Sequence, residues 1–293
     1  MKNKFSHLIL TALMTTAAFF ACTVSGTLDG TPEVKPTVGE KQMILYFSSE
    51  GKKTFSLAGT GTVSIDWGDG SKKETHSISS ALSTFAHNYT GRSDYQIIIT
   101  GANITRLHCI NNNLIRLDVS DNTVLAELNC SDNRLPNDVL DVSKNTALTE
   151  LNCSNNRLSS LEISKNTKLT TLILNTQKNG AGVLTLGSLK VSNTALTELN
   201  CSIQALKTLE VKNNTKLVKL NCRDNQLTSL DVSTNPALIE VDCSNNNLNN
   251  SALSTLFKSL PVNDVMGKTI KITGNSNSYN AKDLPKNWVI IDK

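Results

Sequence analysis

Apolar residues, cysteines and asparagines recur along residues 107–248 with a period close to 21 residues. In the copy at residues 125–135, LAELNCSDNRL, apolar side chains occupy the first, fourth, sixth and eleventh positions, and asparagine occupies the ninth. Successive sixth-position residues are separated by 21, 23, 21, 27, 21 and 21 residues. They are Cys109, Cys130, Cys153, Leu174, Cys201, Cys222 and Cys243. Repetition at a fixed period predicts a stack of similar coils.

The order of positions within each copy, LxxLxLxxNxL, is the leucine-rich-repeat pattern. A second half-copy follows in each period, with Val or Ile in place of Cys, as in residues 114–123. We predict two short extended segments per coil, of which the first joins a parallel sheet with strands about 4.8 Å apart. The inward pairs of that sheet are Leu128/Cys130, Leu151/Cys153, Leu172/Leu174, Leu199/Cys201, Leu220/Cys222 and Val241/Cys243. The predicted fold class is a curved leucine-rich-repeat solenoid with a parallel β-sheet and few helices.

The recurring asparagines predict two further buried columns. Where the chain leaves each strand, backbone groups face inward, and a side-chain amide can satisfy them on two adjacent coils. Removing such an amide leaves unpaired groups worth about 1–3 kcal/mol each. The first-half positions are Asn112, Asn133, Asn156, Gln204, Asn225 and Asn246. The second-half positions, predicted to act in the same way, are Asn122, Asn145, Asn166, Asn193, Asn214 and Asn235.

Residues 1–22 have the pattern of a signal peptide. Lys2 and Lys4 precede an apolar run that is too short to span a membrane comfortably and that ends directly before Cys22. This ending resembles the lipobox of bacterial lipoproteins, which implies that Cys22 is lipidated; an ordinary signal peptide is the alternative. Residues 23–40, which hold scattered Gly and Pro among polar residues, predict a flexible tether.

Residues 41–101 differ from the repeats in their pattern of residue types. Short runs rich in β-branched and aromatic residues are separated by Gly and Ser, which predicts a small antiparallel β domain. The DWGDG segment at residues 66–70, followed by HNY at residues 87–89, resembles the motif order of PKD-type β-sandwich domains. Two roles suit Asp66 and Asp69: binding a cation, or capping the turn by accepting hydrogen bonds from backbone N–H groups. Because no linker follows, we predict that this domain caps the first coil of repeats 102–248.

Residues 249–293 predict a second cap. Apolar residues at helical spacing in residues 252–260 end at Pro261, and two β-rich runs follow at residues 269–273 and 288–291. We expect this α+β cap to lay a helix and two strands over the last coil, where they would cover its core edge.

Three segments carry a resemblance that covers residues 41–293. The LDVS-x-NTxLxxLxC phrase, the DWGDG segment and the ALSTLFKSLP…IKITGN…NWVII ending together resemble the leucine-rich-repeat lipoproteins of Bacteroidetes with a 21-residue repeat. These are similar in style to internalin-like surface proteins. The resemblance implies an outer-membrane lipoprotein of the cell envelope, displayed at the cell surface, with a binding role.

The six repeat cysteines share one inward position with Leu174. Seven cysteines in an exported chain normally suggest disulfides, but a position that accepts leucine is a packing position. Parallel side chains on adjacent coils suit disulfide geometry poorly, and a straight column does not converge on a metal ion. We therefore interpret the thiols as small buried hydrophobes and predict no metal and no other cofactor.

Charge and motifs disfavour other functions. Without Lys2 and Lys4, 27 basic residues stand against 25 acidic ones, and their scatter argues against nucleic-acid binding. We find no phosphate loop and no HExxH helix, and we do not expect His76, His87 or His108 to act with a Ser or Cys nucleophile. The glutamates that recur on one face would stand on an open sheet, which has no pocket to separate their pKa values. We predict no catalytic residue.

Alternation along the first segments leaves one polar face of the sheet outward. The candidate binding residues on this face are Glu127, Asn129, Glu150, Asn152, Glu198, Asn200, Lys219, Asn221, Arg223, Glu240 and Asp242. Ser131, Ser154 and Ser202 are expected on the same face. An equal alternative is that these residues only keep the sheet soluble. The insertion at residues 176–183 either builds a site on a loop or reflects neutral drift.

Two functional hypotheses follow. The first is a monomeric, non-enzymatic protein-binding or adhesion scaffold, held at the membrane by its N-terminal lipid. The second is a glycan-binding accessory lipoprotein of a polysaccharide-uptake system, with Trp67, Tyr89 or Tyr95 as the sugar contact. The low aromatic content, 4%, counts against the second hypothesis.

Overall fold

The computed structural model describes residues 41–91, 93–136, 140–178, 186, 188–191, 195–276 and 278–291. The signal segment with Cys22, the tether 23–40, Asn193 and residues 179–183 of the insertion lie outside the described residues. Across the described ranges, no helix has both the length and the apolar character needed to cross a membrane.

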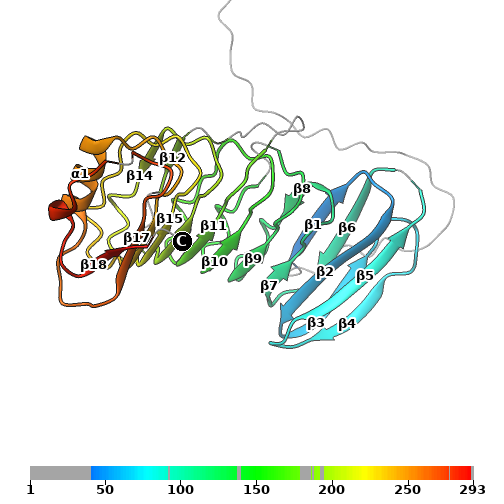
Figure 1. Cartoon of the computed structure of the whole chain (residues 1–293). Helices are drawn as coiled ribbons and strands as arrows, with labels where there is room; N and C mark the ends of the chain where they lie inside the picture. The colour runs from blue at the N-terminus through cyan, green and yellow to red at the C-terminus, as the bar shows by residue number, and fades with distance from the viewer. Residues whose placement is uncertain are drawn as a thin grey trace, which may run out of the picture. The chain divides into compact units, whose positions relative to one another are not determined.

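The repeats form a parallel sheet with one three-residue strand per coil (Figure 1). Its strands are β9 (Glu127–Asn129), β10 (Glu150–Asn152), β11 (Thr171–Ile173), β13 (Glu198–Asn200), β15 (Lys219–Asn221) and β16 (Glu240–Asp242). Neighbouring strands pair in register, so that Leu128, Leu151 and Leu172 are aligned and buried. The predicted parallel-sheet solenoid with few helices is confirmed.

Each strand is short because the chain turns sharply two residues after the cysteine position. The residues at this point have φ between 52° and 58°, in the left-handed region. They are Asn111, Asp132, Asn155, Thr176, Ile203, Asp224 and Asn245. Asn and Asp tolerate this conformation, whereas Thr176 and Ile203 are β-branched and are strained by it. Thr176 is the first residue of the insertion, and Ile203 lies in the coil that follows it.

The second half of each coil is less regular than the first. Strands form there only at β8 (Leu114–Asp118), β12 (Ser188–Lys190) and β14 (Thr208–Glu210) among the described residues. Elsewhere, side-chain amides donate hydrogen bonds to the main-chain carbonyls. Asn145 Nδ2, for example, donates to Val119 O and Asn122 O at 2.8 Å each. A main-chain ladder is therefore replaced by an amide ladder in most of the second halves.

Residues 41–101 form two antiparallel sheets that continue into the solenoid. Their strands are β1 (Gln42–Phe47), β2 (Gly51–Gly59), β3 (Gly61–Asp66), β4 (Glu74–Ile78), β5 (Ser83–Tyr89) and β6 (Tyr95–Thr100). One sheet has the order β4-β3-β6-β1-β8. In the other, β5 pairs with β2, and β2 pairs with β7 (Ile104–His108) at the start of the parallel sheet. Phe47, Phe55 and Trp67 are buried between the two sheets. Main-chain pairing therefore covers both halves of the first coil.

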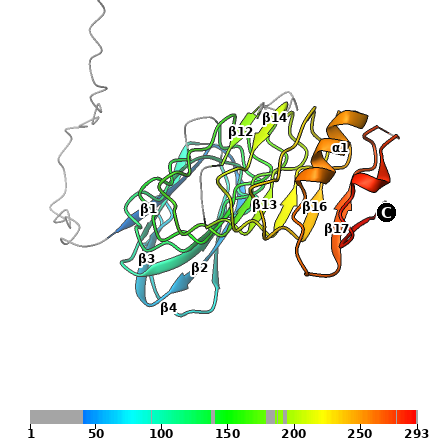
Figure 2. The same cartoon turned by 90° about the vertical axis from the view of Figure 1, so that its left-hand side faces the viewer.

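At the other end of the stack, α1 (Asn250–Ser259) is followed by β17 (Lys268–Lys271), a short 3₁₀ turn (Ala281–Asp283) and β18 (Trp288–Ile290), as Figures 1 and 2 show. The expected helix and two strands are present, and both strands extend the parallel sheet beyond β16, so they adjoin the last coil by main-chain pairing. The reason is that Ile270, Ile272 and Asn275 repeat the spacing of Leu128, Cys130 and Asn133. Asn275 Nδ2 donates to Cys243 O at 2.8 Å, which continues the amide ladder.

Candidate binding face

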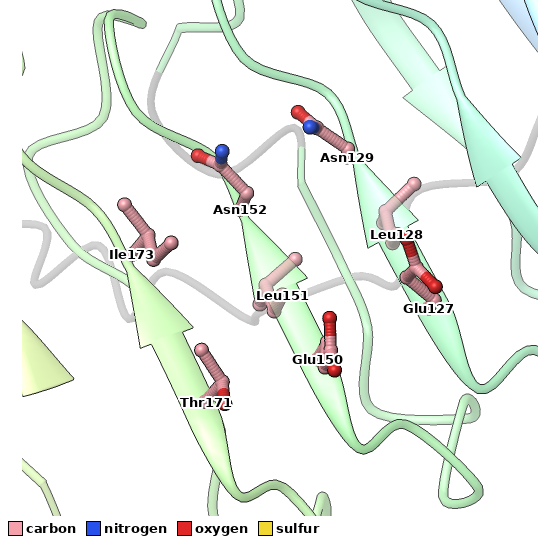
Figure 3. A pocket seen from close by; sticks show the side chains of 8 residues that line it. All are labelled: Glu127, Leu128, Asn129, Glu150, Leu151, Asn152, Thr171 and Ile173. Carbon is pink, nitrogen blue, oxygen red and sulfur yellow. The ribbon is translucent and has the colours of Figure 1, made fainter. Parts of the chain in front are cut away.

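The outward side of β9, β10, β11, β13, β15 and β16, which we call the strand face, carries two rows of side chains. Register pairing places the members of each row on neighbouring strands. The first row is Glu127, Glu150, Thr171, Glu198, Lys219 and Glu240. The second row is Asn129, Asn152, Ile173, Asn200, Asn221 and Asp242. Figure 3 shows both rows on β9, β10 and β11.

Ion pairs neutralise several charges of the strand face. Glu127 accepts a hydrogen bond from Arg106 Nε at 2.6 Å and also contacts His108 Nε2. Burial raises the pKa of Glu127, but the hydrogen bonds from Arg106 and His108 lower it below its ordinary value overall. Lys219 lies 3.9 Å from Glu240. Three charged residues of the strand face, Glu127, Lys219 and Glu240, are therefore already paired within the molecule.

Glu150 and Glu198 differ from the other acids of the first row. Neither forms an ion pair with another residue in the described part of the chain. They stand on β10 and β13, on either side of Thr171 and Ile173 of β11. Ile173 is half-buried and is the one large apolar side chain of the second row. This stretch of the strand face therefore combines net negative charge with an apolar centre.

A shallow hollow of about 140 Å³ lies in the same stretch (Figure 3). Its lining includes Glu127, Glu150, Thr171 and Ile173. The volume suits one side chain or a few water molecules, and ligand pockets for small molecules are usually larger. The hollow therefore indicates a contact point on a broad surface.

Most second-row side chains bond to their own turn. Asn129 Oδ1 accepts from Ser131 N at 3.2 Å, and Asn152 Oδ1 accepts from Ser154 N at 3.1 Å. Asn200, Asn221 and Asp242 make the same bond. The expectation that Ser131, Ser154 and Ser202 lie outward was wrong, because the strand has ended and these residues are buried in the turn; they are exposed by only 5%, 6% and 4%, respectively. First-row residues are therefore better placed to contact a partner than second-row residues.

Arg223, the remaining candidate residue, lies just beyond β15. Its Nε lies 2.7 Å from Asp224 Oδ2, and this pairing raises the pKa of Arg223. The guanidinium is exposed but already has a carboxylate partner.

The amide ladder behind the strand face has the predicted members and one that we missed. Asn133 Nδ2 donates to Cys109 O of the preceding coil at 2.8 Å, and its Oδ1 accepts from Leu114 N at 3.0 Å. Gln177, which we had assigned to the insertion, is fully buried and takes this role in the coil of Leu174. Its position three residues after Leu174, the spacing from Cys130 to Asn133, was the available signal.

The second asparagine column works differently from the first. The Nδ2 groups of Asn145 and Asn235 donate to two carbonyls each. The Oδ1 atoms of both residues are buried without a hydrogen-bond partner among the described residues. The prediction that both columns act alike was wrong on this point, and the second column uses only its donors.

The six repeat cysteines are buried free thiols, which agrees with a packing role. Burial raises the pKa of four of them to about 12: Cys109, Cys153, Cys201 and Cys243. In the described ranges, no group of three or more His, Cys, Asp or Glu residues is arranged to hold a metal ion.

The DWGDG turn of residues 41–101, which we call the front domain, is organised by its own carboxylates. Asp66 Oδ1 accepts from Gly68 N, and Asp69 Oδ1 accepts from Ser71 N, each at 3.0 Å. Asp69 Oδ2 lies 2.6 Å from His87 Nε2. The hydrogen bonds from Ser71 and His87 lower the pKa of Asp69 to about 2. This geometry matches the turn-capping role.

A scan against protein-family models finds no match, and a search of curated proteins finds none either. Among solved structures, the functional domain of InlJ from Listeria monocytogenes, which includes a cysteine ladder, is 35% identical with a TM-score of 0.52. That match covers 61% of this chain and 37% of the other, so this chain spans little more than a third of its length. An internalin, InlF, from L. monocytogenes strain 4b F2365 is 19% identical with a TM-score of 0.45, covering 64% of this chain and 62% of that one.

Three observations lead to the same conclusion about the fold: the register of the strands, the buried cysteine column and the similarity to the InlJ domain. The fold is a leucine-rich-repeat solenoid. In this leucine-rich-repeat solenoid the Leu and Cys columns lie inward, and the strand face is the regular surface that they leave outward.

Proposed function

We propose that this leucine-rich-repeat solenoid is a non-enzymatic, protein-binding or adhesion scaffold of the cell envelope. In this proposal Cys22 carries a lipid that anchors the chain to the outer membrane, and the folded part is displayed at the cell surface. The similarity to the InlJ domain of Listeria monocytogenes supports a protein ligand. We also propose that residues 41–101 form a PKD-like domain.

The observation that carries the proposal is the stretch of the strand face around Ile173. Glu150 and Glu198 present carboxylates without an ion partner among the described residues, and Ile173 lies between their strands. A basic side chain of a protein ligand suits this arrangement, because its apolar stem can cover Ile173 while its charged end meets the carboxylates.

The glycan hypothesis has no comparable support. Trp67 and Tyr89 are exposed by only 1% and 3%, so neither presents a ring face to a sugar, and their assignment as sugar contacts was wrong. Tyr89 instead donates a hydrogen bond to Trp67 O at 2.6 Å. Tyr95 packs against the rings of Phe47 and Tyr89. The three aromatic residues therefore build the front domain.

The test begins with the purified chain, from residue 23 onward, used to capture proteins from envelope and host-surface extracts. A captured protein is then titrated against the double variant Glu150→Arg/Glu198→Arg. We expect its affinity to fall by about tenfold or more, which corresponds to about 1.4 kcal/mol, because attraction becomes repulsion. Asp121→Arg, an exposed acid outside the strand face, is the matched control and should leave the affinity unchanged.

Two results would contradict the proposal. One is an affinity that the double variant leaves at the value of the unchanged chain, which would remove the strand face from binding. The other is an absence of saturable binding to any captured protein, which would support the alternative that the polar rows only keep the sheet soluble.

A further inference from the structure

The C-terminal end of the solenoid gathers most of the large exposed apolar side chains of the described residues. Between α1 and β17, Val262, Val265 and Met266 are exposed by 83%, 49% and 77%, respectively. On and just after β18, Val289 and Ile291 are exposed by 55% and 36%. Single exposed apolar residues are ordinary, but five within one short C-terminal region indicate a contact surface.

The strand β18 is also an open edge. It is the last strand of the sheet within the described residues and pairs only with β17. Its other side therefore offers main-chain N–H and C=O groups to an additional strand. Val289 pairs with Thr269, which pairs with Glu240, so Val289 stands in the first row and points outward.

The two edge strands of the front domain, β4 and β5, expose different residue types from those of β18. The exposed residues of β5 are Thr84, Ala86 and Asn88, and those of β4 include Glu74 and Thr75. Such small or polar residues are typical of edges that do not pair. An edge strand with an exposed valine in its centre is the kind that natural proteins usually cover.

Two lysines, Lys282 and Lys286, lie in the segment that leads into β18. A hollow of about 520 Å³ is lined by this segment and by the end of α1. Its lining consists of Val262, Leu284 and Pro285, of Asp283 and Asn287, and of three lysines: Lys258, Lys282 and Lys286. Lys258 lies 3.5 Å from Asp283, whereas Lys282 and Lys286 form no ion pair with another described residue. Two unpaired lysines would repel the same edge of a second copy and attract an acidic segment.

We propose that β18 accepts an extended acidic segment of another protein as an added parallel or antiparallel strand. The main chain of the segment bonds to the open edge, its apolar side chains pack on Val289 and Ile291, and its carboxylates meet Lys282 and Lys286. This site is distinct from the stretch around Ile173, because β15, β16 and β17 separate β13 from β18.

The probe is a short fluorescent peptide of alternating valine and glutamate, titrated against the full chain. We expect saturable binding, protection of residues 286–291 from hydrogen exchange, and no binding of the same peptide with lysine in place of glutamate. Methylating its backbone nitrogens should abolish binding, because an added strand needs those N–H donors.

Two variants test the residues. Val289→Glu and the double variant Lys282→Glu/Lys286→Glu should each weaken peptide binding by about tenfold or more. The lysine variant leaves the strand itself unaltered, so it remains informative if the first variant unfolds. Ile115→Glu, which changes an exposed apolar residue on β8, is the matched control and should bind normally.

The proposal is overturned if the glutamate peptide does not saturate, if the lysine peptide binds equally well, or if both variants bind as tightly as the unchanged chain. Dimers in sedimentation that Val289→Glu abolishes, in the absence of peptide binding, would assign the edge to a second copy instead. Binding of phosphatidylglycerol vesicles, in the absence of peptide binding, would assign it to a lipid surface. None of these outcomes depends on Glu150 or Glu198.

Discussion

Asn246 shows what one side chain contributes to the stack. Its Nδ2 donates to Cys222 O of the preceding coil and to Cys243 O of its own coil, each at 3.0 Å. Its Oδ1 accepts from Leu227 N at 3.0 Å. A single amide therefore satisfies backbone groups on two coils that have no ladder partner at the turn.

Replacing this amide should destabilise the protein strongly. We expect Asn246→Ala to lower the free energy of unfolding by about 2–5 kcal/mol, because at least two buried backbone groups lose their partner. Asn247→Ala is the control: Asn247 is exposed, and its backbone bond to Leu227 O does not depend on the side chain. Urea unfolding followed by circular dichroism measures both, and equal losses would contradict the role of the amide ladder.

Residue-level prediction succeeded where a side chain repeats at the period of the coil. Asn133 and its equivalents were identified from spacing because each copy places the same residue type at the same turn. Gln177 was missed because it falls within residues 176–183, which we had assigned to the insertion. The left-handed conformation of Ile203 was also unexpected, since a β-branched residue adopts it only when the neighbouring coils impose it.

At the scale of an element, the turn between β3 and β4 depends on two glycines with different surroundings. Gly68 has φ of +74°, and a Cβ there would lie 2.2 Å from Gln96 O of β6. Gly70 has φ of +85°, but a Cβ there would meet nothing within 4 Å. The same substitution at these positions therefore separates backbone strain from steric conflict.

Alanine at either position carries the left-handed strain, about 1–2 kcal/mol. Gly68→Ala should cost clearly more than Gly70→Ala, because the backbone of β6 must also move and Asp66 then loses its bond to Gly68 N. Thermal unfolding of the two variants gives the comparison. If both lose the same stability, close packing of the turn on β6 contributes nothing.

Element-level prediction was limited at the C-terminal end. The helical spacing in residues 252–260 indicated a helix, and α1 covers Asn250–Ser259. The two β-rich runs were identified as strands, but their place was not, because a β-rich run pairs equally well in a covering layer or at the end of a sheet. The decisive feature is long-range: Ile270 aligns with Val241 of β16.

At the scale of the whole molecule, the six buried thiols act together on stability. In the unfolded chain a thiol ionises near its ordinary pKa of 9.0, whereas burial raises the pKa of Cys201 in the folded chain to about 12. Between these values the unfolded state binds fewer protons than the folded state. The free energy of unfolding must therefore fall as pH rises, by about 1.4 kcal/mol per pH unit for each thiol.

We expect this loss to begin near pH 9 and to steepen toward pH 11, since all six thiols contribute. Urea unfolding at a series of pH values measures it. Cys201→Ala should be less stable at neutral pH but should show a slope reduced by one thiol. A slope that does not change in this variant would mean that other groups cause the alkaline loss.

Both ends of the stack are covered by main-chain pairing. In front, β1 pairs with β8 and β2 pairs with β7. At the C-terminal end, β17 and β18 prolong the sheet beside α1. A solenoid needs such terminal units because its coils bury their apolar edges only against neighbours.

The sequence by itself determined the period, the inward columns and the parallel sheet. It could do so because each coil meets a near copy of itself in register, and the pattern of one copy then specifies its contacts with the next. Only the tertiary structure decided which charges of the strand face are paired, that Trp67 and Tyr89 are buried, and that β18 is an open apolar edge among the described residues. These features depend on contacts between residues that do not repeat, and a periodic pattern carries no information about them.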